Sequence, residues 1–257
     1  MKTILVSSHR RSGTHFLIDS IRANIDNSIF PDHRKLPADF NLGSLFSKDY
    51  KILKIFKELI NMDSTVIIKS HLLPEECNIK NPNDEYEELI KQIFISSKKL
   101  YISRDGKDTI VSLYKFLDPT IDFSEFIRSK NDHIVKEVRS ENYFDKNRIL
   151  YWSYHKNQWE KEEDVFQLQF QDLSDQYEKS IQEVLKFLNE PTPKNIIKPQ
   201  IPKIKIWNRF RKRLSKYGIG KLPESSSVKP DQGKSFRGIN SFNNEADIAF
   251  FMDNVKK

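Results

Sequence analysis

Two short stretches of the sequence carry residues suited to binding anions. The first, ILVSSHRRSGTHFLIDSI (residues 4–21), runs from apolar residues into a turn with Arg10, Arg11 and Gly13, and then into apolar residues at helical spacing. A turn that opens a helix faces free backbone N–H groups and the positive end of the helix dipole. Because the arginines add positive charge there, the stretch predicts an anion-binding loop.

The second stretch is YISRDGKDTIVSLYKF (residues 101–116), where an arginine ends a predicted strand and a serine follows eight residues later in a predicted helix. The guanidinium of Arg104 can bind a phosphate through two hydrogen bonds, and Ser112 can add a hydroxyl donor. The alternative is an arginine at an ordinary turn and a serine on a solvated helix face.

A triphosphate-binding loop of the G-x-x-x-x-G-K-[ST] type does not account for the first stretch. Ser8 stands at the position of the first glycine, and Gly13 is followed by Thr14 and His15 rather than by lysine and a hydroxylated residue. The central lysine of that motif is therefore missing. A divergent P-loop kinase stays an alternative, and it would depend on ATP and magnesium.

A basic residue followed by Ser-Gly-Thr, directly after a first strand, resembles the phosphosulfate-binding loop of the PAPS-dependent sulfotransferases (PAPS is 3′-phosphoadenosine-5′-phosphosulfate). The usual wording in that family is close to Pro-Lys/Arg-Ser-Gly-Thr-Thr, and here Arg10 replaces the proline and His15 the second threonine. The resemblance implies a cofactor-binding loop made of Arg11, Ser12, Gly13, Thr14 and His15.

The second stretch resembles the segment with which this family binds the 3′-phosphate of its cofactor, so the resemblance assigns that role to Arg104 and Ser112. Looser matches follow later in the chain. FQLQFQDL resembles a strand ending in Tyr-Glu-Asp-Leu, with Phe170 where a cofactor-binding tyrosine often stands. FRGINSF resembles a segment that closes over the 3′-phosphate, and it keeps Arg237 and Gly238.

The segment IIKSHLLP resembles the family's Lys-Thr-His-Leu-Pro segment, which implies that Lys69 and His71 flank the reacting centre. Sulfuryl transfer needs positive charge and N–H donors at the departing 5′-phosphate, a role for Arg11, Lys69 and the loop N–H groups. His71 is the expected base for an acceptor hydroxyl, because imidazole titrates near neutral pH. His15 is a second candidate base, whereas His9 is expected to be structural. The alternative for His71 is a residue that caps a strand end, and no metal is expected.

Strands and helices alternate along the chain and must position these groups. Strands are predicted from about residues 4, 65, 99 and 164, the second breaking into a loop at Lys69 and the last running to 173, while 31–50 are predicted to be loop. Helices are predicted after the first turn and at 51–61, 84–95, 108–117, 122–129, 146–162, 174–189 and 245–255. This order predicts a single α/β domain over 1–257, with a central parallel sheet flanked by helices and a P-loop-like nucleotide-binding core.

Two further segments are interpreted structurally. Residues 190–240, which are basic and punctuated by prolines, are expected to form a lid or loop region of the single domain. Trp152, His155 and Trp159 share one face of the helix predicted at 146–162, and this pattern is more typical of a core stripe than of a substrate platform.

The composition limits the classes of ligand, metal site and cellular location that we expect. The chain of 257 residues has a formal net charge of +7, which favours an anionic partner. Cys77 is the only cysteine, which excludes an intrachain disulfide and a cysteine-rich zinc site. No run approaches the ~18 apolar residues of a membrane span, so a cytoplasmic location is expected.

The expected acceptor is a small molecule or a glycan or lipid precursor, and the expected protein is a monomer or homodimer that does not bind nucleic acid. The alternative is a nucleic-acid-binding protein that uses residues 203–221, where lysines and arginines are interleaved with aromatic residues.

Overall fold

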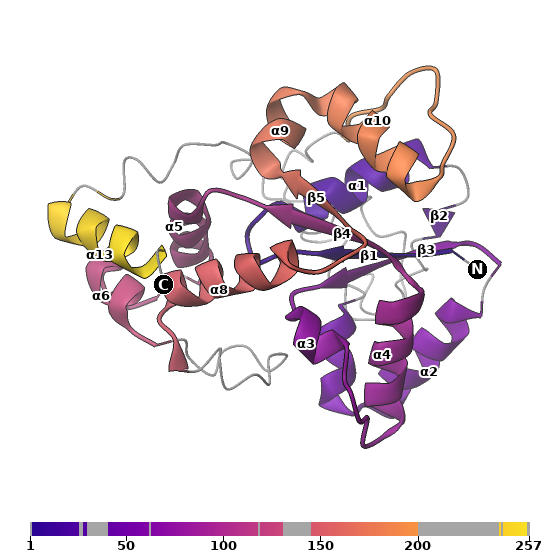
Figure 1. The fold of residues 1–257 in the computed structure, drawn as a ribbon, viewed down its shortest axis with the longest axis horizontal. Coiled ribbons are helices and arrows are strands. Elements are labelled where there is room, and N and C mark those ends of the chain that lie inside the picture. The colour runs from indigo at the N-terminus through magenta and orange to yellow at the C-terminus, as the bar shows by residue number, and fades with distance from the viewer. Residues whose placement is uncertain are drawn as a thin grey trace, which may run out of the picture.

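A five-stranded parallel sheet forms the centre of the computed structural model (Figure 1). The structure describes residues 2–25, 28–29, 41–61, 63–117, 119–130, 145–199, 242 and 244–255. The strands are β1 (Lys2–Ser7), β2 (Ser28–Ile29), β3 (Thr65–Ser70), β4 (Lys98–Ser103) and β5 (Val165–Gln169), in the order β2-β3-β1-β4-β5. Each neighbouring pair is parallel, so all carboxyl ends lie at one edge. The predicted α/β class and parallel sheet are confirmed.

Helices cover both faces of the sheet and its carboxyl edge (Figure 1). One face is covered by α1 (Thr14–Asn24), α9 (Phe170–Asp175) and α10 (Tyr177–Leu188). The other face is covered by the 3₁₀ helix η2 (Leu42–Ser47), α2 (Tyr50–Ile60), α3 (Pro74–Cys77) and α4 (Glu85–Ser96). Beyond the carboxyl edge, α5 (Gly106–Leu117), α6 (Phe123–Arg128), α8 (Arg148–Glu160) and α13 (Glu245–Val255) pack together around a third apolar cluster.

The alternation of side chains along the strands divides the core into two layers. In the central strand β1, Ile4 and Val6 pack in the cluster that contains α1 and α10, whereas Leu5 packs in the cluster that contains α2 and α4. All three side chains are fully buried. Because both faces of a parallel sheet are covered, its strands appear in the sequence as continuous apolar runs, and these runs made the main strands predictable.

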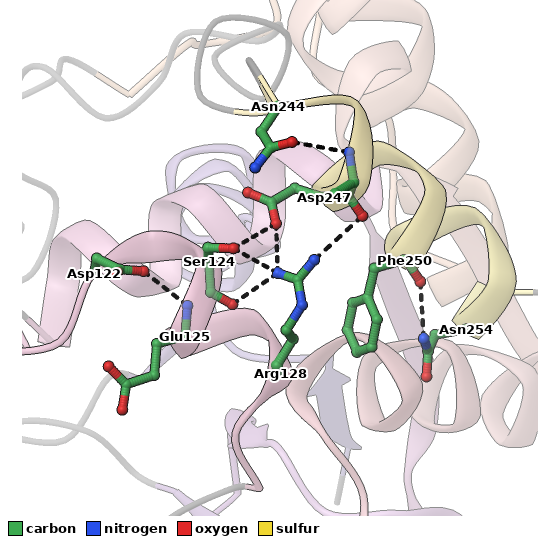
Figure 2. Close-up of polar contacts among 9 residues, drawn as sticks. Asp122, Ser124, Glu125, Arg128, Asn244, Asp247, Phe250 and Asn254 are labelled. Atoms are coloured by element: carbon green, nitrogen blue, oxygen red, sulfur yellow. Dashed lines mark hydrogen bonds and ion pairs between the residues drawn. The ribbon is translucent and has the colours of Figure 1, made fainter.

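Helix α13 makes polar contacts with α6 (Figure 2) in addition to its apolar packing in the third cluster. Arg128 of α6 forms an ion pair with the buried carboxylate of Asp247, which also accepts a 2.7 Å hydrogen bond from the hydroxyl of Ser124. At the other end of the helix, Asn147 donates through Nδ2 to Oδ1 of Asn254 at 2.8 Å. The helix is therefore attached to both α6 and the start of α8.

The last strand is shorter than predicted. Strand β5 ends at Gln169 instead of continuing to 173, and α9 begins at Phe170. The pairing register explains the difference, because Gln169 is opposite Ser103, the last residue of β4, and beyond this point β5 has no partner in that neighbour.

Other boundaries differ by a residue or two. Helix α5 begins at Gly106 rather than near Asp108, since the carboxylate of Asp105 accepts a 2.9 Å hydrogen bond from the backbone N–H of Asp108 and caps the first turn. Strand β3 continues through Lys69 to Ser70. The short elements β2, η2 and α3 were not predicted, because two to six residues carry no periodicity.

The predicted basic lid at 190–240 lies mostly outside the described residues, as do all of 203–221. Its beginning is attached to α1, because the side chain of Asn24 accepts from the backbone N–H of Ile197 at 2.7 Å and donates to its carbonyl at 2.8 Å. Cys77 is a buried free thiol. In the described part of the chain, no helix combines the length and apolar character needed to span a membrane.

Candidate active site

The first predicted anion-binding stretch lies at the carboxyl edge of the sheet. It forms the loop between β1 and α1, and β1 is the central strand with β3 and β4 on either side. The backbone N–H of Ser8 donates to the carbonyl of Ser70 at 3.3 Å, so the loop begins directly beside the end of β3. Ligands of open α/β sheets bind at this edge, where the loops that follow neighbouring strands meet.

The loop turns tightly before α1. The backbone N–H of Ser12 donates to the carbonyl of His9 at 3.3 Å, and Arg11 and Gly13 both have positive φ, 71° and 103°. Gly13 is the N-cap of α1, and a glycine has no side chain to accept hydrogen bonds from the first N–H groups of the helix. The hydroxyl of Ser12 is fully buried without a hydrogen-bond partner among the described residues. These donors form a cradle suited to an anion.

Phe170 fills the space beneath this loop. A Cβ on Gly13 would lie 2.3 Å from Cδ2 and 2.9 Å from Cε2 of Phe170, closer than atoms can approach. The same ring lies against the guanidinium of Arg104, with 4.8 Å between Cζ and the ring centre. Phe170, predicted as a cofactor-site residue, therefore touches both predicted anion-binding stretches.

Arg11 joins the two stretches directly. Its Nε donates a 3.3 Å hydrogen bond to the hydroxyl of Ser112, and its Cζ lies 4.6 Å from the centre of the Phe116 ring. Burial lowers the pKa of Arg11, and the nearby positive charge of Arg104 lowers it further. Two guanidinium groups held this close repel each other, and an anion bound by both would relieve that repulsion.

Arg104 is held in place from α5. It is 5% exposed, and its Nη2 lies 3.3 Å from Oδ2 of Asp108, one helical turn along. A buried ion pair with directed hydrogen bonds restricts the orientation of the guanidinium. The structure thus brings Arg11, Arg104 and Ser112 together, although they lie far apart in the sequence.

His71 lies on the other side of the loop. Its Nδ1 donates to the carbonyl of Ser8 at 2.8 Å, which leaves Nε2 as the nitrogen with the lone pair. Burial lowers the pKa of His71 well below its ordinary value, and the charges of Lys69, Arg10 and His15 lower it further. The imidazole is therefore neutral at physiological pH and able to accept a proton.

Lys69 and His15 approach His71 from different elements. Ile67 packs on the α1 side of the sheet, so Lys69, two residues further along β3, lies on that side as well, and it is 7% exposed. The hydroxyl of Thr14, next to His15, hydrogen-bonds the hydroxyl of Ser8. Lys69 and His15 both act on His71 through their charge, so the predicted catalytic residues lie in the loop or beside it.

Two residues of helix α8 that the sequence pattern assigned to a core stripe also bind the backbone of the segment that carries His71. Nε2 of His155 donates to the carbonyl of His71 at 3.3 Å, and Nε1 of Trp159 donates to the carbonyl of Leu72 at 3.0 Å. Trp152, in contrast, packs in the apolar cluster of α5, α6 and α13. The sequence carried one signal for these contacts. His155 and Trp159 both have a polar ring nitrogen, and polar groups on a buried helix face nearly always have a hydrogen-bond partner.

His9 is a buried residue of the loop, 5% exposed, and its ring packs against those of His155 and Tyr151. Burial lowers the pKa of His9 to about 4. These contacts agree with the structural role expected for it.

Two predicted site residues, Arg237 and Gly238, lie outside the described residues. Across the described ranges, no three His, Cys, Asp or Glu side chains gather in a way that could hold a metal ion.

Comparison with family models identifies the family, and comparison with solved structures supports the fold. A model of the sulfotransferase domain matches residues 1–218. The sequence matches no curated protein. Among solved structures, a mouse sulfotransferase complexed with PAP superimposes with a TM-score of 0.56 at 18% identity, over 98% of this chain and 82% of that one. A retinol dehydratase in complex with androsterone and inactive cofactor PAP gives 0.56 at 14% identity, over 100% and 80%. The same enzyme with retinol and PAP gives 0.54 at 15% identity, over 100% and 82%.

Proposed function

The chain belongs to the sulfotransferase domain family, and from this premise we propose that it transfers a sulfuryl group from PAPS to a hydroxyl or amine of an acceptor, releasing 3′,5′-ADP. The observation that carries the proposal is the hydrogen bond between Arg11 and Ser112, at 3.3 Å. It joins the loop that would bind the 5′-phosphosulfate to the helix that would bind the 3′-phosphate.

The residues present fit this cofactor. Three features favour a ligand with several negative charges: the buried Ser12 hydroxyl, which has no hydrogen-bond partner among the described residues, the glycine at the N-cap of α1, and the adjacent charges of Arg11 and Arg104. Phe170 holds Arg104 against the loop from below. Arg237 and Gly238 are proposed to bind the same 3′-phosphate on the strength of the sequence resemblance.

Bound PAPS would supply the sulfuryl group and a phosphate as leaving group. For such a transfer, Arg11, Lys69 and the N–H groups of Gly13 and Thr14 would stabilise the negative charge that builds on the departing phosphate. Removing one donor of this kind costs about 3 kcal/mol of transition-state stabilisation. His15, in the first turn of α1, would add a hydrogen bond to a phosphate.

His71 is the proposed base. Its Nδ1 is engaged by the carbonyl of Ser8, so the lone pair of Nε2 would take the proton from an acceptor hydroxyl. The pKa of His71 is lowered by burial and by the neighbouring cations, which keeps the imidazole unprotonated before the reaction. His15 is the second candidate, and it lies close enough to influence His71 electrostatically.

The proposed acceptor is a small hydroxylated molecule or a glycan or lipid precursor. The similarity to a fold that binds androsterone supports a small molecule. A single domain over 1–257, a cytoplasmic location, a monomeric or dimeric state and a reaction that requires no metal stay predictions from the sequence.

The test is a calorimetric titration with 3′,5′-ADP, beside 5′-AMP and ATP with magnesium. We expect micromolar binding of 3′,5′-ADP alone, and a loss of about 10-fold or more in Arg104→Ala, because a hydrogen bond to a charged group contributes about 1.5–3 kcal/mol. Arg22→Ala is the matched control, since Arg22 lies in the last turn of α1 and pairs with Asp19 at 3.5 Å.

The other ligands separate the alternatives. Equal binding of 3′,5′-ADP and 5′-AMP would show that Arg104 and Ser112 do not bind a 3′-phosphate. Binding of ATP that depends on magnesium would favour the kinase. Release of 3′,5′-ADP from PAPS with a panel of alcohols and amines then identifies the acceptor, and the His71→Gln variant should release it far more slowly at unchanged 3′,5′-ADP affinity.

A further inference from the structure

One face of helix α8 holds the backbone of the segment that carries the proposed base. His155 donates from Nε2 to the carbonyl of His71 at 3.3 Å, and Trp159 donates from Nε1 to the carbonyl of Leu72 at 3.0 Å. The two donors are four residues apart, so they lie one helical turn from each other on the same face. They bind two consecutive carbonyl groups, which restricts the two peptide units on either side of Leu72, directly after His71.

The proton on His155 is assigned by its partners. The hydroxyl of Tyr101 lies 3.1 Å from Nδ1 of His155, and a phenol can donate to that nitrogen only when the nitrogen is unprotonated. Nε2 must then carry the proton that is donated to His71. Burial, together with the nearby His9, lowers the pKa of His155 to about 3, so the ring is neutral across the physiological range.

Tyr101 is itself held by the anion-binding loop. The backbone of His9 hydrogen-bonds its hydroxyl and opposes the rise in pKa that burial causes for the phenol. The Tyr101 ring stacks on Trp159, with 5.4 Å between centres and 8° between planes, and on His155 at 5.8 Å and 28°. All three side chains are 0–1% exposed, so each has little freedom to move.

These contacts close a circuit of hydrogen bonds. From the loop it passes through Tyr101 to His155 and on to the carbonyl of His71, whose side chain returns to the loop at the carbonyl of Ser8. The direction of the His71 ring therefore depends on contacts to both its side chain and its backbone. Breaking the circuit at His155 would release the carbonyl of His71 and leave the hydrogen bond to Ser8 as the remaining contact of the circuit that orients the ring.

We propose that His155 is a positioning residue, which acts through the backbone of His71 and keeps Nε2 of that imidazole unprotonated and directed at the acceptor. The proposal rests on the proposed function for the role of His71 as a base. The contacts that carry it are independent of any cofactor. His155 lies behind His71 and is fully buried, so the proposal gives it no contact with the substrate.

The experiment measures the tautomer of each ring by NMR in protein labelled with nitrogen-15 at its 6 histidines. In the wild-type protein we expect His155 as the Nε2–H tautomer and His71 as the Nδ1–H tautomer, with His71→Gln used for assignment. In His155→Leu we expect His71 to become a mixture of both tautomers and its pKa to rise toward that of a free histidine. In His155→Gln, whose amide can still donate to the carbonyl, we expect His71 to stay close to the wild type.

The matched control is Tyr151→Phe. Tyr151 lies on the same helix, and its ring packs against His155 with 5.9 Å between centres. The variant removes only the hydroxyl of Tyr151, which is not part of the circuit, so the tautomer and the pKa of His71 should not change. An unchanged His71 in His155→Leu would overturn the proposal. Should that variant fail to fold, the wild-type spectrum decides alone, because an Nδ1–H or a protonated His155 at neutral pH cannot make the contacts described.

Titration of the same variants with 3′,5′-ADP separates this proposal from the proposed function. If His155→Leu alters His71 and binds 3′,5′-ADP within about threefold of the wild type, a difference below 1 kcal/mol, both ideas are supported. If the wild-type protein does not bind 3′,5′-ADP while the tautomer of His71 still changes in His155→Leu, the positioning role of His155 is supported and the proposed function fails.

Discussion

The substitution Gly13→Ala tests the geometry of the loop most directly, because the added Cβ causes both backbone strain and a steric clash. The φ of Gly13 is 103°, a region that costs an L-residue about 1–2 kcal/mol. The added Cβ would also lie 2.3 Å from Cδ2 and 2.9 Å from Cε2 of Phe170. That ring is 5% exposed and packed under Arg104, so it has little room to move, and overpacking of this kind costs about 1–3 kcal/mol.

We therefore expect Gly13→Ala to lower the free energy of unfolding by about 2–5 kcal/mol, a large part of the 5–15 kcal/mol typical of a domain. Urea unfolding followed by circular dichroism measures this loss. Calorimetry should also show weaker binding of 3′,5′-ADP, because the strain displaces the N–H groups that begin α1.

The double variant Gly13→Ala/Phe170→Leu separates the two costs. Replacing the ring removes the clash but leaves the backbone strain, so a double-mutant cycle should return a coupling of about 1–3 kcal/mol in favour of the double variant. Substitutions on the surface usually change the free energy of unfolding by less than about 0.5 kcal/mol. A change no larger than this in Gly13→Ala would refute the reasoning altogether. Zero coupling would attribute the whole loss to the backbone.

Three further predictions concern other parts of the site and fold. Ser112→Ala should weaken 3′,5′-ADP binding about 10-fold or more by calorimetry, because its hydroxyl bonds a charged guanidinium, and Ser112→Thr should retain most of the affinity. Burial lowers the pKa of His155 to about 3 and that of His9 to about 4, so the unfolded state binds more protons below pH 6.5, and each histidine should cost about 1.4 kcal/mol of stability per pH unit. Urea midpoints at pH 7 and pH 5 check this, and a midpoint that does not fall at pH 5, or falls equally in His155→Gln, would contradict it. Asp247→Asn should lower the free energy of unfolding by about 1–3 kcal/mol, because α13 loses its ion pair to α6, and the same change at Asp253 should have little effect.

The main elements could be predicted because their sequence signals are local. The strand before the loop is a continuous apolar run, and Asp49 and Asp84 cap helices α2 and α4 close to their predicted starts. The end of β5 could not be predicted, since FQLQFQDL keeps an alternating pattern past the point where the neighbouring strand stops. Only the pairing register decides that boundary, and register is a property of the tertiary structure.

The site, too, could be predicted only in part from local sequence. The spacing of Arg104 and Ser112 places them at a strand end and on a helix, and the resemblance to a known family supplied the roles proposed for them. Their contact with Arg11 could not be read from spacing, because Arg11 and Ser112 are 101 residues apart. The support of His71 by His155 was hidden for a different reason, since a histidine on a buried helix face looks like core until its hydrogen-bond partner, 84 residues away, is known.

The attachment of α13 has a consequence for how the protein is made. Phe251 of α13 lies against Gly106, the first residue of α5, where a Cβ would lie 2.7 Å from the ring. Helix α5 carries Ser112, yet the chain that supports it is translated long afterwards, and the ion pair between α6 and α13 spans 119 residues. During synthesis the sheet and α1 can form first, whereas the cluster around α5 must wait for α13. A nascent chain would therefore hold a folded loop between β1 and α1 before α5 is in place, and the protease sensitivity of α5 in arrested chains should persist until α13 has emerged.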